Sequence, residues 1–195
     1  MRNKRGGRLL LAGAALLLAA ALLTAYNLCS EAAGERAARQ IAASLAALLP
    51  AQDSSAVTTA EQMQTVTIDG EDYIGVLEIP SLGFSVPVNN VLDDARLKKS
   101  PCRYAGSFLT GDLIIGGHNY KKNFGNLKLL SPGDEVTLTD VDGFVYRYTV
   151  TEIETLRGDD VAGMKAGDWD LTLFTCTLGG ARRVTVRCQR ADAQS

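Results

Sequence analysis

The chain has 195 residues, a formal net charge of −2 at pH 7 and 46% hydrophobic residues, which suits one domain with an appendage rather than two full domains. The charge is unevenly spread. Residues 1–8 carry four basic side chains and no acidic one, so subtracting these four charges leaves −6 on the other 187 residues. An acidic body argues against nucleic-acid binding, because phosphate binding requires a concentrated basic face.

A long uncharged segment rich in leucine and alanine follows the basic residues and occupies residues 9–29. A helix of about 20 such residues is about 30 Å long, which matches the hydrocarbon core of a bilayer. Basic residues flank the cytoplasmic ends of membrane helices. We therefore predict a single-pass transmembrane signal anchor in the cell membrane, with residues 1–8 as a cytoplasmic basic flank and the later residues extracellular.

Two other interpretations of this segment compete with an uncleaved anchor. A cleaved signal peptide usually has a shorter apolar region and a small-residue cleavage site, whereas this segment ends in Ala-Tyr-Asn-Leu-Cys. A lipid anchor on Cys29 is disfavoured, because Asn27 and Leu28 are not the small residues that usually precede a lipidated cysteine. The transmembrane anchor is preferred because the segment is long enough to stay in the membrane.

The four cysteines are divided between the membrane edge and the extracellular part. Cys29 lies at the edge, which leaves Cys102, Cys176 and Cys188 outside. An extracellular compartment permits disulfides, but three cysteines leave at least one free thiol unless another chain supplies a partner. A Cys102–Cys188 bridge is conceivable and is not favoured.

Residues 30–65 are predicted to connect the anchor to a folded domain. Their first part is alanine-rich, with apolar residues at spacings of three and four up to Leu49, which is typical of a helical stalk that ends at Pro50. The remainder is polar and indicates a flexible linker. The folded, catalytic domain is expected at residues 66–190, a usual size for one hydrophobic core, followed by a tail at 191–195.

Short apolar or alternating runs dominate the expected domain. Glycine and proline turns separate these runs, which predicts a barrel or a sandwich of strands. A short helix is expected within Val91–Lys98. The expected strands are Tyr73–Ile79, Ser85–Val88, Leu113–Ile115, Glu135–Thr139, Phe144–Ile153, Asp170–Thr175 and Arg183–Cys188.

Three residues at the ends of such runs carry reactive side chains. His118, the only histidine, follows an apolar run and two glycines, and Cys176 ends another run. Arg183 begins the next run, so the strands of Cys176 and Arg183 are expected to be antiparallel neighbours. A thiolate is the nucleophilic form of cysteine, and a nearby imidazolium or guanidinium favours it. Side chains alternate along a strand, so only one of Arg182 and Arg183 should face the site. Together, His118, Cys176 and Arg183 predict covalent cysteine chemistry.

Several other kinds of site are disfavoured. One histidine and scattered cysteines do not supply the three or four ligands of a zinc site, and no Walker-type or dinucleotide-binding glycine loop occurs. Papain-like peptidases carry the cysteine before the histidine, which is the reverse of the order found here. The acidic residues between 159 and 170 are interpreted as solvated. The sequence therefore predicts neither a metal nor a cofactor.

Four segments resemble landmarks of the sortase family and occur in the family's order. Residues 172–176, TLFTC, resemble the signature Thr-Leu-x-Thr-Cys, and residues 73–80, YIGVLEIP, resemble the first sortase strand. Residues 117–119, GHN, resemble the segment of the catalytic histidine, and Arg183 before VTV resembles the arginine of the last strand. The resemblance covers residues 71–190. It implies a mostly β fold, a closed eight-stranded sortase-type β-barrel with short helices, preceded by the N-terminal transmembrane helix.

The resemblance also implies an activity and a role for each residue. A sortase is a cysteine transpeptidase that cleaves a C-terminal LPxTG-like sorting signal of a surface protein. Cys176 would hold that protein as a thioester, and His118 would exchange protons with the leaving and incoming amines. Arg183 would position the substrate and stabilise the oxyanion. Thr175 matches a family position that lines the substrate groove. The acceptor amine would come from a peptidoglycan precursor or a pilin.

Some features of the chain bear on the sortase subclass and on alternative functions. The N-terminal anchor, the lack of a hydrophobic C-terminal tail and the short stretch 151–169 favour a class D-like or compact class B-like sortase. An L,D-transpeptidase or cell-wall cysteine peptidase would need a His-Gly-rich motif close before the cysteine, which is absent. A non-catalytic, membrane-tethered barrel that binds surface proteins or peptides is the remaining alternative. An intact Cys–His–Arg set argues against it.

Overall fold

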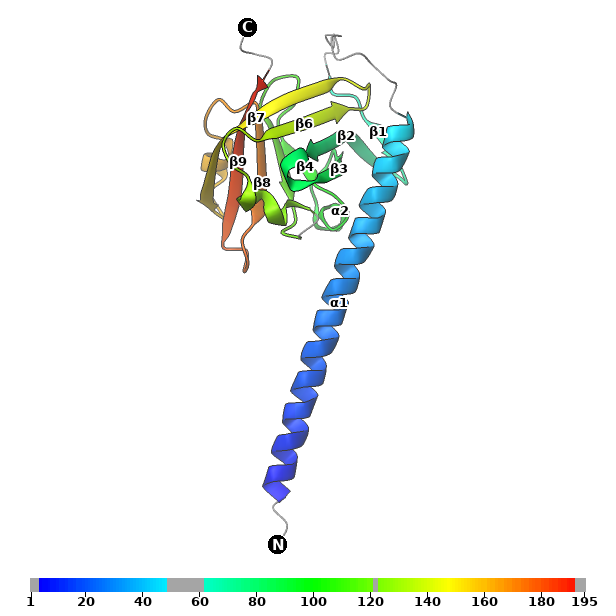
Figure 1. The fold of residues 1–195 in the computed structure, drawn as a ribbon, viewed down its shortest axis with the longest axis vertical. Coiled ribbons are helices and arrows are strands. Elements are labelled where there is room, and N and C mark those ends of the chain that lie inside the picture. Colours follow the sequence, from blue (N-terminus) through cyan, green and yellow to red (C-terminus); the bar gives the residue numbers. More distant parts are fainter. Residues whose placement is uncertain (1–3, 49–61, 121–122, 192–195) are drawn as a thin grey trace.

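A long N-terminal helix leads into a β-barrel in the computed structural model, which describes residues 4–48, 62–120 and 123–191 (Figure 1). Helix α1 (Lys4–Leu48) runs without a break through the predicted anchor and the predicted stalk. Its segment Gly7–Ser30 has a mean hydropathy of 2.3, and none of its residues is buried, so by length and composition it can cross a membrane. Most of the predicted flexible linker lies outside the described residues.

The last turns of α1 pack on the barrel. Ile41 and Leu45 are 6% and 0% exposed, and they form an apolar cluster with Tyr73 and Val76 of strand β2 (Glu71–Ile79). Their spacing of four residues places both side chains on one face of the helix. The sequence predicts a helical stalk but not this contact, because two apolar residues do not identify the surface that they cover.

Eight strands close into a ring, which confirms the predicted barrel (Figure 1). The strand order is β1-β2-β3-β4-β5-β8-β9-β7-β6, and a further pairing of β2 with β6 closes the ring from β2 to β9. Strand β1 adds to the start of β2. The remaining strands are β1 (Val66–Ile68), β3 (Phe84–Asn89), β4 (Cys102–Ala105), β5 (Leu113–Gly117), β6 (Glu135–Asp140), β7 (Val145–Arg157), β8 (Leu171–Cys176) and β9 (Arg182–Arg190).

Inward-facing side chains of all parts of the ring form one core. Leu77, Ile115, Leu138, Leu173 and Val186 come from five different strands, and each is 0% exposed. A fully buried aliphatic side chain contributes about 1.5–3 kcal/mol relative to an exposed one. Because neighbours on a strand point to opposite faces, burying these residues turns the alternate residues of β8 and β9 outward.

The ring closes at a glycine. Gly75 of β2 has φ of 151°, and a side-chain carbon at this position would lie 2.1 Å from the carbonyl oxygen of Thr139 in β6. An L-residue with a side chain would therefore meet both a strained backbone conformation and a collision. Gly75 allows β2 to approach β6 while it also pairs with β3.

Three short elements of the fold are not predicted by the sequence analysis. Strand β4 has only four residues, and helix α3 (Val161–Lys165) is barely one turn long with Gly163 inside it. Such elements have no usable periodicity, and they form because the rest of the fold holds their ends. β1 is similarly short. Helix α2 (Asp94–Leu97) lies inside the region where a short helix is expected.

Candidate active site

Three strand ends meet at one end of the barrel. Strands β5 and β8 are parallel neighbours in which Gly117 lies opposite Thr175, so His118 and Cys176 are the next residues of two adjacent chain segments. Strands β8 and β9 are antiparallel, and Cys176 is paired directly with Arg183. The register therefore brings together the three reactive residues that the sequence analysis selects.

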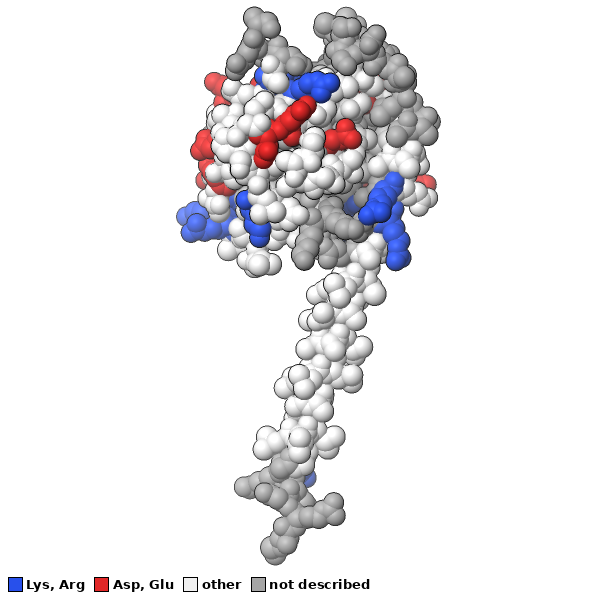
Figure 2. Space-filling view, viewed as in Figure 1, with Lys and Arg blue, Asp and Glu red and all other residues white. Residues whose placement is uncertain are grey.

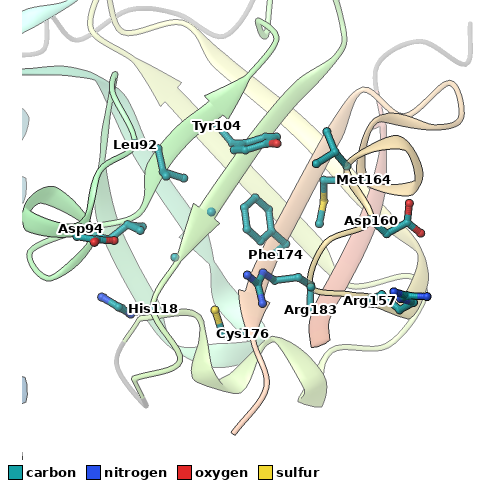
Figure 3. Close-up of a pocket in the computed structure, with 15 residues that line it drawn as sticks. Leu92, Asp94, Tyr104, His118, Arg157, Asp160, Met164, Phe174, Cys176 and Arg183 are labelled. Carbon is teal, nitrogen blue, oxygen red and sulfur yellow. The ribbon is translucent and has the colours of Figure 1, made fainter. Parts of the chain in front are cut away.

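These residues line a pocket of about 320 Å³ (Figure 3). His118, Cys176 and Arg183 lie at one end of it in Figure 3. The segment containing α2 forms one wall and the segment containing α3 forms another. The apolar part of the lining includes Leu92, Leu97, Tyr104, Val161, Met164 and Phe174. The pocket can therefore hold an extended chain with apolar side chains beside the reactive groups.

An aromatic pair forms the floor of the pocket. Phe174 precedes Cys176 by two residues, so both side chains leave β8 on the same face. Its ring meets the Tyr104 ring edge-on, with centroids 5.5 Å apart and an interplanar angle of 86°. A side-chain carbon at Gly116 would lie 2.6 Å from the Phe174 ring, so a glycine in this position leaves room for the aromatic floor. The spacing of two from Cys176 is the sequence signal that could have identified Phe174.

His118 is half-buried, and its pKa depends on burial and on two nearby charges. Burial lowers the pKa of His118 below its usual 6.5, the negative charge of Asp94 raises this pKa, and the positive charge of Lys98 lowers it. The Tyr120 ring lies alongside, with centroids 4.8 Å apart. The imidazole is therefore mostly neutral at pH 7, the form that can accept a proton from a thiol or an amine.

Two substitutions should move the pKa of His118 in opposite directions. Asp94→Asn removes the charge that favours the imidazolium and is expected to lower the pKa, while Lys98→Met removes a repelling charge and is expected to raise it. NMR titration of the imidazole measures both, and its resonances need no assignment because the chain has one histidine. Lys165→Met serves as an exposed control. Shifts of equal sign for Asp94→Asn and Lys98→Met would contradict this account.

Thr175 holds the two strand ends together. Its side chain is 2% exposed, and its hydroxyl donates a hydrogen bond of 2.8 Å to the carbonyl oxygen of Gly117. Strand alternation turns this side chain inward, so it is not among the residues that line the pocket. The resemblance implies that Thr175 lines the substrate groove. We propose instead that Thr175 is a positioning residue that fixes the spacing of His118 and Cys176.

The other two cysteines of the barrel are in different surroundings. Cys102 and Cys188 are buried, and burial raises the pKa of each thiol to about 12. All four cysteines are free, so the conceivable Cys102–Cys188 bridge is not formed. Cys176 is half-exposed and opens into the pocket. It is therefore the barrel thiol that a substrate can reach.

Only one of the neighbouring arginines lines the pocket, as the alternation of side chains predicts, and it is Arg183. Arg182 is exposed and does not line the pocket. The Nη1 of Arg183 donates hydrogen bonds to the carbonyl oxygens of Gly180 at 2.8 Å and of Arg182 at 3.2 Å. A side-chain carbon at Gly158 would lie 3.2 Å from this nitrogen, so a glycine leaves room for the guanidinium. The hairpin carbonyls thus hold one end of the guanidinium beside Cys176.

Comparison with known proteins assigns the barrel to a family. The family model described as "Sortase domain" matches residues 77–191, which is more than half of the chain. This chain belongs to the sortase family. No curated protein shows a significant sequence match. Among the residues that the structure describes, no group of three or more His, Cys, Asp or Glu is placed to hold a metal ion.

Solved sortase structures share the fold of this sortase. Sortase C1 from Streptococcus agalactiae is 29% identical with a TM-score of 0.56, and the match covers 64% of this chain and 70% of that one. Clostridium perfringens sortase C, solved with the C-terminal cell wall sorting motif, is 27% identical with a TM-score of 0.55, over 63% of this chain and 72% of that one.

A structure named as a sortase D5 is also similar in fold. The Clostridium perfringens sortase D5 transpeptidase is 22% identical with a TM-score of 0.53, and the match covers 67% of this chain and 82% of that one. At this identity the likeness concerns the fold alone. The two structures described above, at 29% and 27% identity, are a sortase C1 and a sortase C. The class D-like or compact class B-like assignment therefore stays a prediction.

The α3 wall of this sortase is fastened by a buried arginine that the sequence analysis missed. Arg187 of β9 is 2% exposed, and its Nε lies 2.8 Å from a carboxylate oxygen of Glu154 in β7. Its Nη1 donates to the carbonyl oxygen of Met164 at 2.8 Å and to the hydroxyl of Thr172 at 3.0 Å, and its Nη2 donates to the carbonyl oxygen of Gly163 at 2.6 Å. The backbone of the wall is therefore tied to the barrel.

Arg187→Leu should destabilise the fold strongly. The substitution leaves a half-buried carboxylate and three oxygen acceptors without their partner, which is expected to lower the free energy of unfolding by about 2–4 kcal/mol. Chemical denaturation followed by fluorescence measures this, since the only tryptophan, Trp169, follows α3 in the chain. Arg147→Leu is the control, because its ion pair with Glu135 is exposed and should contribute less than about 1 kcal/mol. Equal losses for both variants would contradict the role of Arg187.

Proposed function

We propose that this protein is a membrane-anchored cysteine transpeptidase that cleaves a C-terminal LPxTG-like sorting signal and transfers the surface protein to an amine. The observation that carries the proposal is the pairing of Cys176 with Arg183 across β8 and β9, next to His118 at the end of β5. Membership of the sortase family supports the reaction type. A Clostridium perfringens relative was solved with a cell wall sorting motif.

The first half-reaction forms a thioester. The thiol proton of Cys176 passes to His118, and the thiolate attacks the carbonyl carbon of the penultimate residue of the signal. Negative charge develops on the carbonyl oxygen, where the guanidinium of Arg183 stabilises it. The C–N bond then breaks, His118 returns the proton to the leaving amine, and the surface protein remains on the sulfur.

The second half-reaction releases the product. The neutral imidazole of His118 accepts a proton from the incoming amine as its nitrogen attacks the thioester carbonyl. Breaking of the C–S bond returns the thiolate of Cys176 and leaves a new amide. We propose a peptidoglycan precursor or a pilin lysine as the source of the amine.

The apolar lining of the pocket supports a peptide with apolar side chains. Leu97 of α2 and Met164 of α3 both line the pocket, together with Tyr104 and Phe174. An LPxTG-like signal places its apolar leucine and proline on one side of the scissile bond, where these side chains can bury them. The α1 span supports an anchor in the cell membrane, with the N-terminus cytoplasmic and the barrel extracellular.

One experiment tests the proposal directly. The full chain in detergent micelles is incubated with a library of quenched fluorescent sorting-signal peptides, with and without an added amine. We expect cleavage of at least one LPxTG-like peptide and transfer of its N-terminal part to the amine. We also expect a covalent adduct on the protein, whose added mass equals that of the peptide without its leaving fragment. Binding without cleavage or adduct would instead support the non-catalytic barrel.

A further inference from the structure

An exposed leucine occupies the tip of the hairpin beside the active site. Leu178 follows Cys176 by two residues and is 92% exposed. The hairpin is well formed, because Thr177 donates a backbone hydrogen bond to Arg182 at 2.9 Å and Gly180 donates one to Thr177 at 2.9 Å. Single exposed apolar residues are common on proteins. Leu178 differs from these because it lies at the end of the barrel that faces the apolar span of α1.

The hairpin lies at the end of the barrel that faces the membrane span. In Figure 1, β9 runs away from the N-terminal half of α1, so the β8–β9 hairpin projects toward that half. The barrel is docked to α1 through Ile41 and Leu45. Ile41 lies only eleven positions after the end of the span at Ser30, which is about 17 Å of helix. The helix therefore holds this end of the barrel close to the membrane surface.

Positive charge accompanies the exposed leucine. Arg182 is exposed at the base of the hairpin, and Lys98 is exposed near His118 at the same end of the barrel. Arg36 is exposed on α1, between the span and the docked turns. Figure 2 shows that the charged side chains at the lower end of this face are Lys and Arg, while Asp and Glu lie higher. Such a surface complements the anionic headgroups of a bilayer.

We propose that the β8–β9 hairpin is a membrane contact, with Leu178 inserted into the interface of the anionic bilayer that holds α1. Arg182, Lys98 and Arg36 lie against lipid headgroups, and the mouth of the pocket is held at the level of the membrane surface. A substrate or acceptor that is itself held in this membrane meets Cys176 by diffusion in two dimensions. The inference rests on the membrane anchor of the proposed function.

Tryptophan fluorescence in vesicles tests the contact. The full chain, with its only tryptophan removed by Trp169→Phe, is reconstituted into phosphatidylcholine vesicles with or without phosphatidylglycerol. Leu178→Trp places a reporter at the hairpin tip. Thr149→Trp places a matched reporter on an exposed position of β7, opposite Gln189 at the far end of β9. Lipids brominated near the headgroup quench a tryptophan that enters the interface.

The expected result is roughly threefold or greater quenching of the Leu178→Trp reporter over the Thr149→Trp reporter in anionic vesicles. Adding Arg182→Glu should reduce this quenching in anionic vesicles and leave it unchanged in neutral ones. Equal quenching of the two reporters overturns the proposal. A blue shift that grows with the protein-to-lipid ratio and occurs without quenching also overturns it, and assigns the tip to a second copy of the chain.

Alkaline extraction separates this inference from the proposed function. Protein that stays in the vesicles while the Leu178→Trp reporter is not quenched rejects the hairpin contact and leaves the anchor intact. Protein that is released rejects the anchor, and with it the hairpin contact. The peptide-cleavage assay uses detergent micelles, so its outcome does not depend on the contact.

Discussion

Cys176→Ala is expected to abolish both peptide cleavage and the covalent adduct. The variant lacks the sulfur that attacks the carbonyl, and the residual rate should lie at least about 10⁴-fold below that of the wild type. Intact-mass measurement should find no adduct at any time. The side chain opens into the pocket rather than the core, so the unfolding transition should stay nearly unchanged, which separates lost chemistry from lost structure.

The other cysteines provide the controls for this substitution. Cys29→Ala changes an exposed residue of α1 and should retain full activity. Iodoacetamide should label Cys176 in the folded protein but not Cys102 or Cys188, because burial raises the pKa of these two thiols to about 12. An active Cys176→Ala variant, or an adduct on another cysteine, would reject the nucleophile assigned here.

Arg183→Ala is expected to lower kcat by about 10²–10³-fold, the usual consequence of removing one donor to a developing oxyanion. Arg182→Ala is the matched control. It removes the same side chain one residue away, on the face of β9 that does not meet the pocket, and should change kcat less than about twofold. Peptide cleavage measured over a range of substrate concentrations gives kcat and KM for both variants.

The division between kcat and KM assigns the role of Arg183. A loss in kcat alone indicates stabilisation of the transition state, whereas a rise in KM alone indicates uniform binding of the substrate backbone. Arg183→Lys retains the charge but not the planar fork, so partial recovery is expected. Equal activity of Arg183→Ala and Arg182→Ala would remove Arg183 from the mechanism.

The three candidate site residues can be selected from the sequence because their signals are local. Cys176 ends an apolar run and His118 follows another, so both were expected where strands end. The period of two in a strand limits the site to one of Arg182 and Arg183, and the resemblance to the sortase motif selects Arg183. Thr175 illustrates the limit of such reasoning, since the same period turns its hydroxyl inward to Gly117.

Other parts of the site had no local signal. Arg187 stands in a run of alternating residues like any exposed strand arginine, and its partners are brought to it by α3, β7 and β8. A charged side chain that is 2% exposed is stable only where acceptors surround it. The residues next to Arg187 in the sequence do not indicate that these acceptors surround it.

The apolar span, the alternating strands and the three candidate site residues can be predicted from the sequence alone. These depend on the order of apolar and polar residues within a few positions, which one strand or helix turn converts directly into geometry. Only the folded barrel shows the pairing of Cys176 with Arg183, the position of His118 beside them, and the docking of Ile41. Pairing registers and the burial of side chains join segments far apart in the chain, and so they depend on how the whole barrel closes.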